Sequence, residues 1–228
     1  MSLLSARGVT LSFGTTPALR GADLTVAAGE ILAIMGPSGS GKSTLLHCLA
    51  GILVPDEGEI HCDGQRIDTL GENGRSELRR EKFGFVFQFG QLVPELTAEE
   101  NVALPLLLNG VKRAEAVRQA RAWFPRLGLD GLGHRRSGEL SGGQAQRVAL
   151  ARGMVARPRV LFADEPTGSL DSLTGEQVMG LMVDTAREEG TTVVVVTHEP
   201  RVAAYADREV TVRDGKVHGV SMETVGAS

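Results

Sequence analysis

The sequence from residue 36 reads Gly36-Pro37-Ser38-Gly39-Ser40-Gly41-Lys42-Ser43, and Thr44 comes next. This segment matches the pattern GxxxxGK[ST], in which glycines let backbone N–H groups turn towards phosphate oxygens. Lys42 adds a positive charge for the β- and γ-phosphates, and the Ser43 hydroxyl is a hard ligand suited to Mg²⁺. The alternative is a flexible Gly/Ser turn that binds nothing.

The flanking residues supply the context that a phosphate-binding loop needs. The apolar run from Glu30 to Met35 is predicted to be a buried strand, and Ser43 to Leu49 a helix. The N-terminus of that helix would point its partial positive charge at the same anion. We therefore expect a P-loop NTPase that binds ATP and Mg²⁺, with nucleotide contacts from residues 36–44.

A second apolar run, from Val160 to Ala163, ends in the two carboxylates Asp164 and Glu165. Ligands of open α/β sheets bind at the carboxyl ends of the strands, so both side chains are expected beside the phosphates. Asp164 is predicted to hold Mg²⁺ through water, and Glu165 to polarise the water that attacks the γ-phosphate. A solvated acidic turn before Pro166 is the alternative.

The order of the remaining predicted elements gives the fold class. Two strands that alternate like an antiparallel pair open the chain, and a helical stretch follows at about residues 91–140. In that stretch Thr97 and Glu100 match a capping box, and residues 111–127 have helical periodicity. Strands then alternate with helices: a helix at 141–155, a strand at 159–163, a helix at 172–189, a strand at 191–197 and a hairpin at 208–220.

This order predicts an α/β protein in one domain, residues 1–228. We expect a P-loop NTPase with a mostly parallel core sheet, an antiparallel β subdomain and a helical subdomain inserted at about residues 91–140.

The composition is that of an ordinary globular protein of 228 residues with a net charge of −4. A nucleic-acid-binding protein usually carries a basic surplus, so no nucleic-acid partner is expected. Cys48 and Cys62 form no CxxC pattern and are expected to be reduced thiols. No signal peptide is recognisable, and runs such as Val193 to Val196 are too short to span a bilayer. If the protein acts at a membrane, another chain must supply the spanning helices.

The segment Leu140-Ser141-Gly142-Gly143-Gln144 resembles the LSGGQ signature of ABC ATPases. It follows the helical stretch and opens a predicted helix, where serine and glycine donors can make a second anion site. The resemblance implies a homodimer that sandwiches ATP head to tail, with Ser141 to Gln144 of one subunit covering nucleotide held by the other. A merely capped helix is the alternative.

Four more residues occupy positions of family motifs, and the resemblance implies their roles. Gln88 looks like the Q-loop glutamine, which contacts Mg²⁺ and water and senses the membrane partner. Asp171 looks like the D-loop residue at the dimer interface, and His198 like the switch histidine that reaches the γ-phosphate. With Glu165, Gln88 and His198 would be the catalytic residues. Phe13 looks like the aromatic that stacks on adenine, although the family more often has Tyr there, and a core phenylalanine is the alternative.

Within the family, residues 78–88, 92–97 and 164–168 resemble one branch: the macrolide-exporter, lipoprotein-release, cell-division and antimicrobial-peptide-resistance ATPases. The resemblance implies an ATPase that drives a separate permease, by export or mechanotransmission, from the cytoplasmic side of the cell membrane. The permease is expected to contact the Gln88–Glu99 region. The apolar residues of that region would either form an exposed contact or be buried in the subdomain; they are Phe89, Leu92, Val93 and Leu96.

Three residues depart from the pattern of this branch, in which Asn is frequent at Ser169, a bulky residue at Gly90 and a longer polar residue at Ala145. None of the three removes a catalytic group. Two other functions are alternatives: a regulatory clamp that binds ATP on a membrane protein without transport, and a soluble ABC ATPase of DNA repair or translation. The second is disfavoured because the chain has neither a long coiled-coil insert nor a second such domain.

Overall fold

The computed structural model describes residues 2–219, so Val220, the expected end of the last strand, lies outside the described residues. The strands are β1 (Ser2–Phe13), β2 (Thr16–Ala27), β3 (Ile31–Met35), β4 (Glu57–Cys62), β5 (Gln65–Arg66), β6 (Phe83–Phe87), β7 (Val160–Asp164), β8 (Thr192–Val196), β9 (Arg208–Arg213) and β10 (Lys216–His218). The helices are α1 (Lys42–Leu49), α2 (Glu72–Lys82), α3 (Ala98–Leu108), α4 (Arg113–Arg121), α5 (Trp123–Arg126), α6 (Gly142–Met154), α7 (Ser172–Glu189) and α8 (Pro200–Ala203), with a 3-10 turn at Ser137–Glu139.

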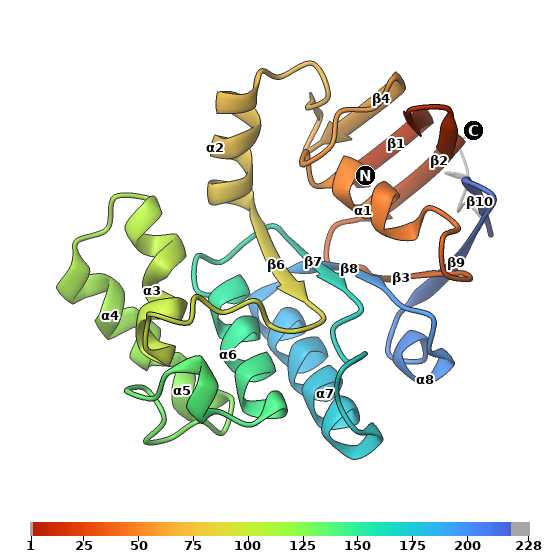
Figure 1. Ribbon diagram of the computed structural model, residues 1–228. Coiled ribbons are helices and arrows are strands. Elements are labelled where there is room, and N and C mark those ends of the chain that lie inside the picture. Colours follow the sequence, from red (N-terminus) through yellow and green to blue (C-terminus); the bar gives the residue numbers. More distant parts are fainter. Residues whose placement is uncertain (1, 220–228) are drawn as a thin grey trace, which may run out of the picture.

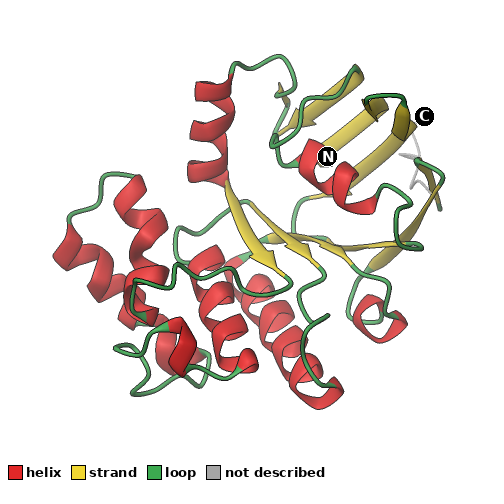
Figure 2. Cartoon of the chain, in the orientation of Figure 1, coloured by secondary structure: helices red, strands yellow, loops and turns green. Residues whose placement is uncertain are grey.

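The strands form two sheets, shown in Figures 1 and 2. The larger sheet has the order β10-β9-β3-β8-β7-β6, and all neighbours except the β9–β10 hairpin are parallel. The smaller sheet, β2-β1-β4-β5, is entirely antiparallel. The central strands of the larger sheet, β3, β7 and β8, read as continuous apolar runs because this sheet is covered on both faces. The predicted mostly parallel core and antiparallel β region are confirmed.

Alternate residues of the central strands face two separate cores. In β3, Leu32 and Ile34 pack in the core that contains Leu45 of α1 and the smaller sheet. Ile31 and Ala33 pack in the other core, which contains residues of α6 and α7. Helices α1 and α6 therefore lie on opposite faces of the larger sheet, as Figure 1 shows.

The two cysteines lie in the α1 core as buried free thiols. Burial raises the pKa of Cys48 to about 12 and that of Cys62 to about 11. Among residues 2–219, no helix combines the length and the apolar character that crossing a membrane requires.

Helices α3, α4 and α5 pack beside α6 on the second core (Figure 1). The predicted capping box starts α3: the Thr97 hydroxyl accepts from the Glu100 N–H, and the Glu100 carboxylate accepts from the Thr97 N–H. The stretch predicted as one helix at 111–127 is instead divided into α4 and α5. Pro125 has no N–H to continue the α-helical ladder from α4, which accounts for the break.

Helix α2 is the main element that the sequence did not predict. Only Leu78 among its residues is buried, so no apolar stripe marks it. Polar bonds attach it instead: Arg79 donates to the Gly51 carbonyl at 2.6 Å, and Arg75 and Arg79 each donate to the Glu72 carboxylate at 2.7 Å.

Candidate functional site

The loop of residues 36–41 joins β3 to α1 and packs against the backbone of β2 and of β9. A Cβ atom on Gly36 would lie 2.2 Å from the Val212 carbonyl oxygen, and one on Gly41 2.5 Å from the Ala18 carbonyl oxygen. Both glycines also have positive φ angles, 143° and 105°. No other residue fits these two positions, so the neighbouring backbone requires these glycines independently of any ligand.

The loop has polar groups available for a ligand. The exposed residues Pro37, Ser38 and Gly39 open it to solvent. Across the loop, Lys42 Nζ donates to the Pro37 carbonyl oxygen at 2.9 Å. The Ser40 hydroxyl is buried without a hydrogen-bond partner among the described residues. Because buried polar atoms are rarely left unpaired, this loop suits a ligand with several oxygen atoms.

Asp164 and Ser43 meet beside the loop. Ser43 Oγ donates to Asp164 Oδ1 at 3.0 Å. Burial raises the pKa of the Asp164 carboxyl above its usual value, and the hydrogen bond from Ser43 opposes that shift. A partly buried carboxylate next to a hydroxyl oxygen is a hard donor set, which fits Mg²⁺.

Glu165 and His198 follow the ends of the adjacent parallel strands β7 and β8. His198 Nδ1 lies 2.9 Å from both carboxylate oxygens of Glu165. The Glu165 backbone has φ 49°, an uncommon value for a side chain of this size, and its N–H donates to the Val196 carbonyl at 2.9 Å. Two of the three residues predicted for catalysis, Glu165 and His198, therefore contact each other directly, which their spacing in the sequence did not indicate.

Gln88 lies at the same edge of the sheet, because β6 is the neighbour of β7 and Phe87 pairs with Asp164. Ser169 Oγ donates to the Gln88 carbonyl oxygen at 2.7 Å. A Cβ atom on Gly168 would lie 2.8 Å from Gln88 Nε2. The Gln88 side chain is thus packed against the turn that follows Glu165.

The signature segment lies apart from this group, at the start of α6 on the other face of the sheet. Ser141 caps α6, and its hydroxyl and the Gln144 side chain form a capping box. Gly143 allows α6 to approach α7, since a Cβ atom there would lie 2.4 Å from Thr174 Cγ2. Asp171 caps α7 by accepting from the Thr174 N–H at 3.0 Å, and this contact lowers the pKa of its carboxyl. The ends of β6, β7 and β8 therefore place Gln88, Asp164, Glu165 and His198 at one edge of the larger sheet, and Ser43 bonds Asp164 there. Residues 142–144 begin α6, which packs on the face of that sheet opposite α1.

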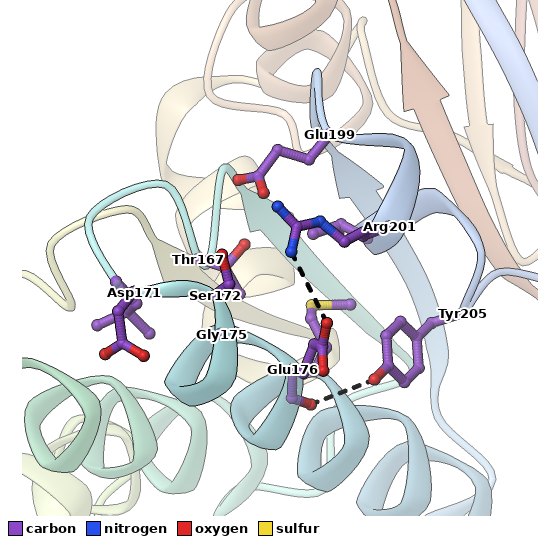
Figure 3. A pocket seen from close by; sticks show the side chains of 11 residues that line it. Thr167, Asp171, Ser172, Gly175, Glu176, Glu199, Arg201 and Tyr205 are labelled. Carbon is purple, nitrogen blue, oxygen red and sulfur yellow. Dashed lines mark hydrogen bonds and ion pairs between the residues drawn. The ribbon is translucent and has the colours of Figure 1, made fainter.

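A small cavity separates the start of α7 from α8 (Figure 3). Arg201 lies 3.9 Å from the Glu176 carboxylate, and the Tyr205 hydroxyl donates to the Glu176 carbonyl at 3.4 Å. Its volume of about 40 Å³ has room for water and not for a nucleotide. This cavity is therefore no candidate for the substrate site.

The exposed fractions of the Phe13 and Phe89 side chains decide between the alternatives that the sequence left open. Phe13, at the end of β1, is 57% exposed, so the alternative of a core phenylalanine is wrong. Phe89 is 72% exposed, whereas Leu92, Val93 and Leu96 are half-buried. The expected apolar contact surface is therefore reduced to Phe89, because the other three side chains turn partly into the fold.

A groove of about 520 Å³ lies between α2, β6, α3 and α6. Apolar side chains line it, among them Phe85, Phe87 and Leu108, together with three guanidinium groups, those of Arg79, Arg80 and Arg152. Of the segment Gln88–Glu99, only Gln91 lines this groove. Reasoning from the sequence missed the groove because α2 forms one wall and was not predicted.

The chain is similar to known proteins in both sequence and structure. Residues 19–168 match the family described as ABC transporter. The chain is 44% identical over 204 residues to the lipoprotein-releasing system ATP-binding protein LolD of Hyphomonas neptunium, covering 90% of both chains. It is 44% identical over 223 residues to LolD of Geobacter metallireducens, covering 95% of this chain and 98% of the relative.

A solved structure agrees with these matches. The ATP-binding cassette MJ0796, a dimer in a post-hydrolysis state with bound ADP and phosphate, matches with a TM-score of 0.85 and 39% identity. The match covers 94% of this chain and 96% of that one. Similarity at this level over nearly the full length confirms both the predicted fold class and the resemblance. The chain belongs to the ABC transporter family, as a subunit that binds and hydrolyses ATP.

Proposed function

We propose that this chain binds MgATP in the loop of residues 36–44 and hydrolyses it to drive a membrane permease. The observation that carries the proposal is the meeting of two pairs at one edge of the sheet: Ser43 with Asp164, and Glu165 with His198. Such a site, with a phosphate loop beside a carboxylate and its positioning partner, is suited to phosphoryl transfer to water.

In this proposal Glu165 is the general base. Its carboxylate takes a proton from water while the water oxygen attacks the γ-phosphorus and the bond to the β-phosphate oxygen breaks. His198 holds that carboxylate through Nδ1, which leaves Nε2 for the γ-phosphate. Lys42 and the loop N–H groups stabilise the negative charge. Mg²⁺, held by Ser43, Asp164 and Gln88, would neutralise phosphate charge.

We further propose that two copies sandwich two nucleotides head to tail. The signature residues of each chain lie on the face of the sheet opposite α1, so a partner's signature is needed to cover the nucleotide. Ser141 to Gln144 would supply these contacts, Asp171 would lie at the interface, and exposed Phe13 would stack on adenine. The dimeric state of the solved relative supports this arrangement.

The groove between α2, β6, α3 and α6 is the proposed binding site for the permease, on the cytoplasmic side of the membrane. An apolar groove that carries three arginines suits a short amphipathic segment with acidic side chains. Exposed Phe89 lies on the loop that continues from β6, one wall of the groove, and extends the apolar contact. Residues 91–140 would act as the helical subdomain that moves with this segment.

The test is ATP hydrolysis by the purified chain, alone and with its permease, measured over a range of protein concentrations. A rate per subunit that rises with concentration, or rises on adding the permease, supports a site completed by a second copy. A rate per subunit that is constant under all conditions would show that one chain suffices, and the sandwich would be wrong.

The relatives named above suggest the cargo class, a lipid-anchored protein. Reconstituted in liposomes with its permease, the chain should hydrolyse ATP faster when a lipid-anchored protein is present in the same membrane. The matched control is the same cargo without its lipid anchor. Equal rates with both forms would overturn this cargo class while leaving the ATPase intact.

A further inference from the structure

The backbone of residues 87–91, which contains Gln88, is held by side chains from two other elements. Gln146 of α6 donates to the Phe87 carbonyl oxygen at 2.8 Å. Arg152, also of α6, donates from Nη2 to the Gly90 carbonyl at 2.6 Å and from Nη1 to the Gln91 carbonyl at 2.8 Å. With the bond from Ser169 to Gln88, four of these five carbonyl oxygens accept a side-chain hydrogen bond.

This loop depends on those bonds for its shape. Gly90 and Gln91 have φ angles of 67° and 45°, and two consecutive residues in this region are disfavoured without outside support. The support comes from the same helix that begins with the signature residues. The position of Gln88 in one ATP site is therefore tied to the helix that is proposed to close the other.

Arg152 has a second feature. Its guanidinium is partly buried, and among residues 2–219 no carboxylate lies within ion-pair distance of it. Burial lowers its pKa below the usual value. Backbone carbonyls satisfy donors but do not neutralise a buried charge, so an additional anion would be favourable here. The side chain lines the groove, where such an anion can reach it.

We propose that Arg152 is a positioning residue that couples the groove to ATP hydrolysis. A carboxylate of the permease segment in the groove pairs with the guanidinium, which also fixes the Gln88 loop against the signature helix. Binding of the permease segment thereby affects both ATP sites: one through Gln88, and the other through the signature helix α6. This inference rests on the groove being the permease site, as proposed above.

The experiment compares Arg152→Gln and Arg152→Lys with Arg126→Gln in complex with the permease. Arg126 is the matched control, because it lies on α5 and its ion partners are Glu188 and Glu189, away from the Gln88 loop. We expect Arg152→Gln to lower the basal rate, because the Gln88 loop loses two bonds, and to lower the ratio of the permease-stimulated rate to its own basal rate by about fivefold or more. A merely structural role would lower the basal and the stimulated rates equally and leave that ratio unchanged.

Stimulation in Arg152→Gln equal to that of Arg126→Gln would overturn the proposal. If Arg152→Gln does not fold, Arg152→Lys decides, because an ammonium keeps the charge but cannot bridge two carbonyls as the planar guanidinium does. Full stimulation with Lys would then contradict it.

The groove itself is tested separately with the variant Leu108→Cys. A thiol-reactive cross-linker should join the new cysteine to the permease. The parent chain is the control, since its two cysteines are buried. Absence of the cross-link would refute the docking site, and with it the coupling. A cross-link combined with normal stimulation in the Arg152 variants would refute the coupling alone.

Discussion

Some of the unusual backbone conformations in this protein occur at residues of the proposed ATP site. Gly36 and Gly41 have positive φ angles where the loop packs against β9 and β2, and Glu165 has φ 49° directly after β7. The bond from the Glu165 N–H to the Val196 carbonyl holds that conformation. Local strain of this kind persists when the surroundings determine it, and here it directs the carboxylate towards His198.

Replacing Glu165 with Gln keeps the shape of the side chain and removes the proposed base. We expect the rate of hydrolysis to fall by about 10² or more, while ATP still binds and locks the dimer. Single-turnover hydrolysis and gel filtration with ATP measure the two effects. Hydrolysis at the wild-type rate would show that Glu165 is not the base.

Replacing Gly41 with Ala places a Cβ atom 2.5 Å from the Ala18 carbonyl oxygen. The expected loss of stability is about 2 kcal/mol or more, with loss of ATP binding. Gly39→Ala is the control for stability, because its φ is also positive but nothing lies within 4 Å of the new atom. It should cost only about 1 kcal/mol. Equal melting temperatures for the two variants would rule out the close contact as the cause.

Most site residues could be predicted at this scale, because the loop glycines, Lys42 and Asp164 stand in short motifs whose chemistry restricts the choice of residue. Arg152 could not be found in this way. Its role depends on where the carbonyls of Gly90 and Gln91 point, and no pattern of side chains in the sequence records that. The reason for a glycine at position 90 could not be predicted from the sequence either. A Cβ atom there would lie 3.3 Å from the Ala145 carbonyl oxygen, so the packing of α6 favours a residue without a side chain.

At the scale of elements, capping side chains start helices α3 and α6. Thr97 and Ser141 form the same capping box at α3 and α6. Thr97→Ala should lower stability by about 1 kcal/mol, a shift of about 2–4 °C in melting temperature, with the basal ATPase rate unchanged.

Ser141→Ala should lower both the stability and the ATPase rate, because its hydroxyl also serves the proposed nucleotide contact. Normal hydrolysis in Ser141→Ala would leave that residue with a structural role only.

Helix α2 should respond to acid through Glu72. Hydrogen bonds from Arg79, Arg75 and Ser76 lower the pKa of Glu72 from 4.5 to about 2. A lowered pKa stabilises the fold above the unfolded value, and the stabilisation is lost as the pH falls from about 4.5 towards 2. Wild-type protein should therefore melt higher than Glu72→Gln near neutral pH, and the difference should shrink in acid. A difference that is constant with pH would mean that these bonds do not stabilise α2.

Elements with an apolar pattern could be predicted from the sequence, and elements without one could not. Strands β3, β7 and β8 are continuous apolar runs, and α7 has the bounds that its amphipathic pattern predicted. Helix α2 is held by arginine contacts to residues distant in the sequence, such as the bond from Arg79 to Gly51. The division between α4 and α5 was missed because periodicity alone does not register the missing N–H of Pro125.

At the scale of the whole molecule, the larger sheet separates the phosphate loop from the signature. A dimer with two shared sites then makes a prediction about mixtures. Lys42→Ala and Ser141→Arg should each be inactive alone, but an equal mixture should recover up to about a quarter of the sites, because a mixed dimer contains one intact pair. ATPase assays of the mixture at high protein concentration measure this. No recovery, with mixed dimers demonstrated, would contradict shared sites.

The two buried thiols have a consequence for how this protein can be studied. A thiol reagent needs both access and a thiolate, and Cys48 and Cys62, with pKa values of about 12 and 11, offer neither at neutral pH in the folded chain. Labelling therefore requires the core around α1 to open. When opening and closing are fast compared with the thiol reaction, the rate of labelling is proportional to the population of the open form. Nucleotide bound at the proposed site, at the start of α1, should lower that population by a factor of one plus the ratio of the ATP concentration to Kd. Slower labelling at increasing ATP concentrations would thus give the dissociation constant even in variants that cannot turn over.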